Sequence, residues 1–301
     1  MKKSSITSLM SAFGRVYHAE NADTPIFDDR KARELITEEE YSTIANYILG
    51  GIDFFAPDKK DSFADNEEAL RYLVNTQIAP TPLARAAFCE TALKTSMRTG
   101  TEQYVILGAG MDTFAFREPD FMEKYDVFEL DHPLTQEDKR ERINSAGWTI
   151  PPKLHFVPID FTKDDIGVKL TESGYRTEKT TFFSWLGVSM YLDRSAIENL
   201  LQNIASISAN GSHLLFDYAD AGLFHSEERR VQNMLAMAKA GGEEMISSFD
   251  QMSLESMLSE HGFMICEHLN CKEIHDLFFS GRTDGLSAFE HINYAHAVLR
   301  K

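Results

Sequence analysis

Cysteine is scarce in this sequence: three cysteines, Cys89, Cys266 and Cys271, occur among 301 residues. Their spacing predicts no disulfide framework and favours a reduced, intracellular protein. No grouping of cysteine and histidine has metal-ligand spacing, so we expect no metal site. Long apolar runs are also missing, including at the N-terminus, so we expect neither a signal peptide nor a transmembrane helix. These absences together predict a soluble protein of the cytoplasm.

Basic residues are outnumbered by acidic ones. The chain has 30 Lys and Arg against 47 Asp and Glu, a formal net charge of -17, and no Lys/Arg run is longer than a pair. Nucleic acids and anionic membranes both favour basic surfaces, so we expect neither as a main partner. The apolar content of 43% is ordinary for a globular protein, and the length permits one large domain or two smaller ones. The oligomeric state is not indicated.

Two patterns divide the chain. Residues 1–98 have the spacing of helices and contain no convincing strand. The first expected helix has one apolar face, which either packs on the core or forms a lid over an active site. From residue 99 onward strands alternate with helices, which predicts a doubly wound, mostly parallel α/β sheet of about seven strands. We therefore expect an N-terminal helical lid, residues 1–98, and an α/β core, residues 99–301.

The expected elements follow from apolar periodicity and from Gly and Pro breaks. Strands are expected at residues 104–107, 126–130, 154–158, 180–186, 212–216, 263–269 and 289–299, the last as an edge strand. Helices are expected at residues 6–17, 37–49, 66–78, 83–97, 133–145, 164–173, 194–207, 227–240 and 253–261.

The stretch QYVILGAGMDTFAFR, residues 103–117, is the one around which the chain is organised. A buried strand, a glycine turn and a helix start bring bare backbone close to a nucleoside ligand. Dinucleotide-binding loops read G-x-G-x-x-G, but here Gly108 and Gly110 are followed by Thr113 at the third position. The missing glycine and the acid at Asp112 argue against NAD. They favour a ligand with a cationic end, such as an amino group or a sulfonium.

Two more acids stand at the ends of expected strands. Asp131 ends the second strand and is placed to accept hydrogen bonds from both ribose hydroxyls. Asp160 follows the third strand, where it can accept from an adenine amino group while Phe161 packs near the base. Taken singly, each acid is more often a helix cap or a turn residue. Together at consecutive strand ends they predict S-adenosylmethionine.

The segments LGAGMDTFAFR, FELDHP, VPIDF and WLGVSMYL resemble the S-adenosylmethionine-dependent methyltransferases of the leucine carboxyl methyltransferase family. The similarity is greater to its bacterial branch, associated with small-molecule and polyketide O-methylation, and extends over nearly the whole chain, including GEEMISSFD near residues 242–250. It implies a Rossmann-like class I methyltransferase fold, and O-methylation of a small-molecule hydroxyl or carboxyl group.

The resemblance also implies residue roles. It implies that the glycine turn lines the methionine part of the cofactor, that Asp131 holds the ribose, and that Arg85 pairs with the cofactor carboxylate. Leu186 stands where many relatives carry a glutamate, which weakens any transfer of protein-phosphatase methylation to this chain. The expected cofactor-binding set is Arg85, Gly108, Ala109, Gly110, Asp112, Asp131, Asp160, Phe161 and Leu186.

The residues that act on the methyl acceptor are harder to identify. A carboxylate acceptor needs no general base, whereas a hydroxyl needs one. We expect the acceptor under the N-terminal helices, where the catalytic candidates are His18 and Tyr191, with Tyr17, Asp217 and Tyr218 nearby. His18 is the most base-like, although a lone histidine on a helix is more often structural.

Two other functions stay open. One is an NAD(P)-dependent oxidoreductase, against which Thr113 and the lack of a Tyr-x-x-x-Lys pair argue, since Ser195 follows Tyr191 at that spacing. The other is a protein that binds S-adenosylmethionine without catalysis. The sequence does not distinguish O- from N- or C-methylation.

Overall fold

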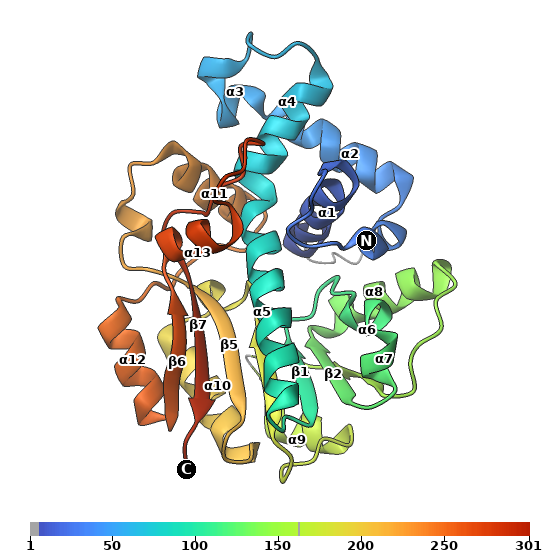
Figure 1. Cartoon of the computed structure of the whole chain (residues 1–301), viewed down its shortest axis with the longest axis vertical. Coiled ribbons are helices and arrows are strands. Elements are labelled where there is room, and N and C mark those ends of the chain that lie inside the picture. The colour runs from blue at the N-terminus through green and yellow to red at the C-terminus, as the bar shows by residue number, and fades with distance from the viewer. Residues whose placement is uncertain (1–5, 162) are drawn as a thin grey trace.

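A seven-stranded sheet forms the centre of the molecule (Figure 1). The structure, a computed structural model, describes residues 6–161 and 163–301. The strand order is β3-β2-β1-β4-β5-β7-β6. The strands are β1 (Gln103–Leu107), β2 (Asp126–Asp131), β3 (Leu154–Pro158), β4 (Thr181–Trp185), β5 (His213–Ala219), β6 (Phe263–Leu269) and β7 (Ile292–Leu299).

The first five strands are parallel, as expected, and β7 runs antiparallel to both of its neighbours. The sheet is wound outward in two directions from β1, which pairs with β2 on one side and with β4 on the other. Open α/β sheets bind their ligands beyond the carboxyl ends of the strands at such a switch point. The fold therefore collects the loops after β1, β2, β3 and β4 at one edge.

The expectation that residues 289–299 form an edge strand is wrong. The structure places β7 between β5 and β6, and β6 is at the edge. Seven of the eight β7 side chains are buried, including the polar Asn293 and His296, whose alternation with apolar residues imitates a half-exposed strand. His296 is instead satisfied inside the protein, since its Nε2 lies 3.0 Å from Nδ1 of His213.

The expected helices are all present in the described residues, and the structure adds α13 and several helices of a single turn. The N-terminal ones are α1 (Ile6–Asn21), α2 (Glu38–Gly50), α3 (Ile52–Phe55), α4 (Asn66–Leu73), the π-helical turn Val74–Ile78 and α5 (Pro80–Arg98). The others are α6 (Phe114–Arg117), α7 (Pro119–Met122), α8 (Pro133–Ser145), α9 (Ile166–Glu172), α10 (Arg194–Ile207), α11 (Arg229–Ala240), α12 (Gln251–Glu260) and α13 (Cys271–Phe278). The sequence analysis missed α13, although Asn270 and Glu273 form a capping box at its start.

Alternate residues of β1 enter two separate apolar cores. Val105 and Leu107 pack among buried side chains of α9, α10 and α12. Tyr104 and Ile106 face the other way and pack with α1, α5 and the remaining N-terminal helices. The period-2 alternation of the strand thus explains why a single short apolar segment is buried on both sides. Figure 1 shows α5 running along the sheet and α1 lying beyond the ends of β1 and β2.

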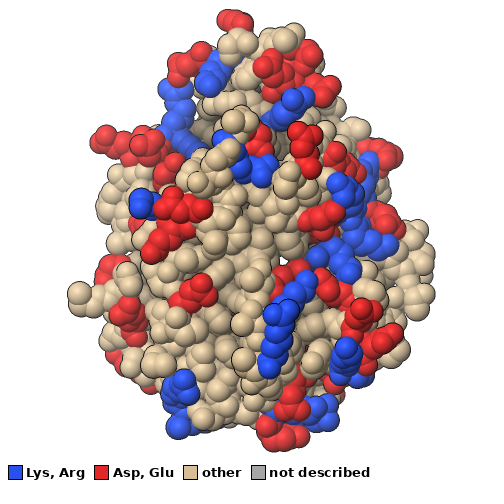
Figure 2. Space-filling view, viewed as in Figure 1, with Lys and Arg blue, Asp and Glu red and all other residues tan. Residues whose placement is uncertain are grey.

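The surface and the helices give two further observations. On the face drawn in Figure 2, basic side chains are interleaved with acidic ones. Among the described residues, no helix has the length and apolar content needed to cross a membrane.

Candidate functional site

A cavity of about 510 Å³ opens at the carboxyl edge of the sheet. This volume lies within the range of roughly 300–1,000 Å³ that is typical of small-molecule sites. The structure brings all nine expected cofactor-binding residues, together with Tyr191, into its lining; we call it the strand-edge cavity. The lining members are Arg85, Gly108, Ala109, Gly110, Asp112, Asp131, Asp160, Phe161, Leu186 and Tyr191.

The glycine turn presents bare backbone to this cavity. Gly108 and Gly110 have φ values of 76° and 49°, in the left-handed region that favours glycine. A Cβ on Gly108 would lie 2.5 Å from Cγ2 of Val188, so a side chain does not fit there. The turn is anchored to β2, because the backbone N–H groups of Gly108 and Ala109 both donate to the carbonyl of Leu130.

Asp131 connects the end of β2 to the glycine turn. Its Oδ2 accepts from the backbone N–H of Gly110 at 2.5 Å, and its Oδ1 accepts from the N–H of His132 at 2.6 Å. Burial raises the pKa of Asp131, while these two N–H donors oppose the shift. A carboxylate has about four acceptor sites, so two remain for a ligand in the cavity.

Asp112 and Asp160 each bond to a neighbouring residue in their own turn, as expected for cap or turn residues. Asp112 Oδ1 accepts from the N–H of Phe114, two residues on, at 2.7 Å, and so stabilises the turn that enters the short helix α6. Asp160 Oδ2 accepts from Lys163 Nζ at 2.6 Å. Each acid therefore stabilises its own turn and lines the cavity at the same time. The cap and the ligand-binding interpretations are compatible.

Arg85 is held by a residue whose position the sequence did not reveal. Its Nη1 donates to Oδ2 of Asp217 at 2.9 Å. Asp217 was expected after the fifth strand, near the acceptor, but it lies inside β5, is completely buried, and accepts from the N–H of Gly187 at 2.6 Å through Oδ1. A Cβ on Gly187 would lie 2.5 Å from Arg85 Nη1. The one hint in the sequence is an acid within the apolar strand HLLFDYA.

Tyr191 lines the strand-edge cavity. Burial raises the pKa of its hydroxyl to about 12, with the nearby charge of Arg85 opposing the shift. The hydroxyl therefore keeps its proton at neutral pH and does not act as a base. Tyr218, the other tyrosine expected here, directs its hydroxyl to Nε2 of His268 at 2.8 Å and is not among the residues that line the cavity.

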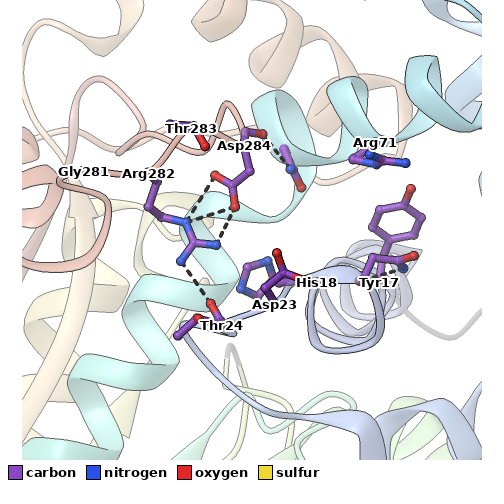
Figure 3. A pocket seen from close by; sticks show the side chains of 12 residues that line it. Tyr17, His18, Asp23, Thr24, Arg71, Gly281, Arg282, Thr283 and Asp284 are labelled. Carbon is purple, nitrogen blue, oxygen red and sulfur yellow. Dashed lines mark hydrogen bonds and ion pairs between the residues drawn. The ribbon is translucent and has the colours of Figure 1, made fainter.

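His18 is not brought to the strand-edge cavity. Together with Tyr17 it lines a second cavity of about 380 Å³, drawn in Figure 3, which shares no lining residue with the first. His18 Nε2 accepts from the backbone N–H of Ile26 at 2.9 Å, and burial lowers the pKa of the ring to about 4. His18 therefore does not line the cavity that holds the expected cofactor-binding residues. Arg15 of α1 lines the strand-edge cavity, and His18, about one helical turn further along α1, lines the second cavity instead.

The first helix contributes cavity residues that the sequence analysis did not identify. Ser8, Ser11 and Arg15, spaced three and four apart on α1, line the strand-edge cavity. Arg15 is fixed there by Asp29, whose Oδ2 accepts from Nε at 2.8 Å. The hydroxyl of Thr113 donates to Oδ1 of the same Asp29 at 2.5 Å. Threonine in place of the third glycine thus attaches the N-terminal region to the glycine turn.

Comparison with known proteins identifies the family of the chain. The family model described as leucine carboxyl methyltransferase matches residues 8–205. A Bacillus subtilis (strain 168) protein, YktD, named as a candidate S-adenosyl-L-methionine-dependent methyltransferase, is 46% identical over 300 residues, 98% of each chain. A Mycolicibacterium paratuberculosis protein with the same kind of name is 29% identical over 234 residues, 78% of this chain and 71% of the relative.

A solved structure supports the fold. A protein of the DUF574 family from Streptomyces avermitilis superposes with a TM-score of 0.54 at 14% sequence identity, over 85% of this chain and 95% of the other. The Rossmann-like arrangement expected from the sequence is confirmed.

Proposed function

The chain belongs to the leucine carboxyl methyltransferase family and is an S-adenosylmethionine-dependent methyltransferase, and from this premise we propose that it methylates an oxygen of a small molecule, a carboxylate or an acidic hydroxyl. Family membership sets aside the oxidoreductase alternative. The reaction forms a carbon–oxygen bond as the sulfur–methyl bond breaks, and S-adenosylhomocysteine leaves.

The residues of the strand-edge cavity fit the cofactor. Bare backbone at Gly108 and Gly110 admits a close approach, and Asp131 has acceptor sites left for a ribose diol. We propose that Gly108, Ala109 and Gly110 line the methionine part, with Asp112 beside it, and that Asp160 and Phe161 contact adenine. Arg85, which gives Nη1 to Asp217, has further guanidinium donors for a carboxylate. Leu186 contributes an apolar wall.

The place of Tyr191 in the lining of the strand-edge cavity is the observation that carries the choice of oxygen. A hydroxyl whose pKa is about 12 donates a hydrogen bond and cannot take up a proton at neutral pH. An anionic oxygen has several lone pairs, so one can accept the hydrogen bond from Tyr191 while a second attacks the methyl group. An amine nitrogen has a single lone pair, which the reaction itself requires. The most base-like side chain on α1, His18, lies in the other cavity. An acceptor that is already ionised fits these residues best.

We further propose that residues 1–98 act as a cap over the site. Residues of α1 line the strand-edge cavity, and Arg15 Nη2 donates to the carbonyl of Met111 in the glycine turn at 2.9 Å. A cap on this edge would hold the acceptor in line with the methyl group and exclude water. The three free cysteines fit a reducing compartment, and we propose the cytoplasm.

An acceptor screen tests the proposal. Purified protein and isotopically labelled S-adenosylmethionine are incubated with compounds matched in skeleton that carry a carboxyl, a phenolic hydroxyl, an alcohol or an amino group. We expect methyl esters or aryl ethers, identified by mass spectrometry. With a carboxylate acceptor kcat should be flat between pH 6 and 8, whereas with a phenol it should rise with pH. Methylation confined to amines contradicts the proposal.

The Tyr191→Phe variant separates positioning from binding. Loss of the hydroxyl donor should lower kcat about tenfold with the best acceptor, as expected for one hydrogen bond to a charged group. The affinity for S-adenosylhomocysteine should not change. An unchanged kcat would show that the hydroxyl does not touch the acceptor.

A further inference from the structure

The second cavity is a separate compartment of the molecule. It lies between the end of α1, the loop that follows α1, α4 with the π-helical turn, and the loop at residues 281–284 (Figure 3). The two cavities share no lining residue, and α1 packs directly on the residue before α5: a Cβ on Gly14 would lie 3.2 Å from Cα of Ala79. A ligand in this compartment is therefore separated from the glycine turn by helix packing.

One wall of the cavity is a fixed network that joins distant parts of the chain. Arg282 donates through Nε and Nη2 to the carboxylate of Asp284, and through Nη1 to the carbonyl of Thr24 at 3.1 Å. Asn75, a residue of the π-helical turn that is 5% exposed, donates to the carbonyl of Asp284 at 2.8 Å. The charges of Arg282 and Asp284 compensate each other. Turns of this helix type occur frequently at functional sites.

His18 supplies a buried donor to the cavity. Because Nε2 accepts from the N–H of Ile26, the proton of the neutral ring is on Nδ1. His18 is 2% exposed, and within residues 6–161 and 163–301 Nδ1 has no hydrogen-bond partner. Nδ1 is not one of the fully enclosed atoms either, so it reaches the cavity that His18 lines. The N–H therefore has no protein acceptor among the described residues and is open to a ligand acceptor in the cavity.

Arg71 supplies a cation at the other side of the same cavity. Figure 3 shows it facing the ring of Tyr17, with His18 and Arg282 across the space. Arg71 forms an exposed pair with Glu67 one helical turn away, at 3.1 Å, and half of its side chain is exposed. Such a surface pair contributes little and exchanges readily. The charge of Arg71 also acts on the Tyr17 hydroxyl, and the guanidinium keeps further donors for a ligand because it has five N–H groups.

We propose that this cavity is a second ligand site, which binds a small-molecule carboxylate through Nδ1–H of His18 and the guanidinium of Arg71. A carboxylate accepts only, so it matches the two donors, Nδ1–H of His18 and the Arg71 guanidinium, and its two oxygens suit the guanidinium fork. Of the two acids in the lining, Asp284 is neutralised by Arg282 and Asp23 is exposed. The site is independent of the methyl acceptor and of its chemistry.

A binding experiment with a matched pair of probes tests this site. Benzoate and its neutral isostere benzamide are titrated into the protein by ligand-observed NMR, with S-adenosylhomocysteine present at saturation. We expect saturable binding of benzoate that is at least about tenfold tighter than that of benzamide, the ratio expected for one charge-assisted contact. Equal affinity for the two probes would overturn the proposal.

Two variants assign the binding to this cavity. Arg71→Gln should weaken benzoate at least about tenfold and leave the affinity for S-adenosylhomocysteine unchanged, while the matched surface variant Arg98→Gln changes neither. His18→Phe keeps an aromatic ring, removes the Nδ1 donor, and should weaken benzoate as well, provided that its melting curve shows a folded protein. Benzoate binding that survives both Arg71→Gln and His18→Phe belongs to the acceptor site and would overturn the proposal without affecting the proposed function.

Discussion

Asp217 holds Arg85 at the mouth of the strand-edge cavity: its Oδ2 accepts from Arg85 Nη1 at 2.9 Å. Through Oδ1 the same carboxylate accepts from the N–H of Gly187 at 2.6 Å. The carboxylate is completely buried, whereas 17% of the Arg85 side chain is exposed. A buried charge must be paired and hydrogen-bonded, and here both oxygens are satisfied. The pair therefore fixes the guanidinium beside the loop after β4.

Replacement of Asp217 should disturb the cofactor site through Arg85. In Asp217→Asn the guanidinium loses its anionic partner, and we expect the affinity for S-adenosylhomocysteine, measured by calorimetry, to fall about tenfold. Arg85→Gln should lose at least as much. If Asp217 acts through Arg85, the double variant loses no more than Arg85→Gln alone. Additive losses would mean that Asp217 acts on the ligand by another path.

Asp131 and Asp126, at the two ends of β2, provide a test variant and a control for the proposal that Asp131 binds the ribose of the cofactor. Asp131, at the carboxyl end, faces the strand-edge cavity, whereas Asp126, at the start, pairs with His155 at 2.9 Å away from it. Asp131→Ala should weaken S-adenosylhomocysteine about 100-fold, because two charge-assisted hydrogen bonds to the ribose are lost. Asp126→Ala should leave the affinity within about twofold. Circular dichroism should show both variants folded. An Asp131→Ala protein with wild-type affinity would overturn the assignment.

The glycine turn and the strand-end acids could be predicted because their chemistry is local. Gly108 follows directly on β1, and Asp131 is the last residue of β2, so a parallel sheet is enough to bring them together. Apolar periodicity likewise located the strands of the parallel half. It located β7 as well but placed it at the edge of the sheet, because a buried His296 looks like an exposed residue until its partner His213, on another strand, is known.

The remaining features depend on contacts between distant segments. Asp217 is 132 positions from Arg85, and Asn75 is 209 positions from Asp284. His18 was predicted to be a base from its residue type, but its cavity depends on where the loop at residues 281–284 packs. Thr113 was interpreted only as a missing glycine, although it bonds to Asp29. No pattern along the chain encodes such pairings.

Gly187 and Gly147 separate steric from backbone effects. Both have a φ of 70°, so alanine strains the backbone similarly at either position. A Cβ at Gly147 meets nothing within 4 Å, whereas at Gly187 it would lie 2.5 Å from Arg85 Nη1. Gly187→Ala should therefore displace the guanidinium and weaken S-adenosylhomocysteine about tenfold or more. Gly147→Ala should lower the free energy of unfolding by about 1 kcal/mol and leave the affinity unchanged. Equal affinities in the two variants would show that Arg85 does not contact the cofactor.

The buried imidazole of His296 should make stability depend on pH. Burial, together with the neighbouring His213, lowers its pKa to about 4, while in the unfolded chain a histidine titrates near 6.5. Below about pH 6.5 the unfolded state binds the proton and the folded state does not. The stabilisation present above pH 6.5 is therefore lost as the pH falls toward 4, by about 1.4 kcal/mol per pH unit at most.

Urea unfolding at pH 7.5, 6.5, 5.5 and 4.5 measures this loss. His296→Phe lacks the titrating group and should lose less stability than the wild type between pH 6.5 and 4.5, although it is less stable at pH 7.5 because His213 loses its partner. The exposed His225→Gln serves as the control and should follow the wild-type curve. Groups away from this pair, including Glu129, whose pKa burial raises and Lys139 lowers, titrate in all three proteins, so the difference between curves reports the His213–His296 pair. Parallel curves for the wild type and His296→Phe would mean that His296 is protonated equally in both states.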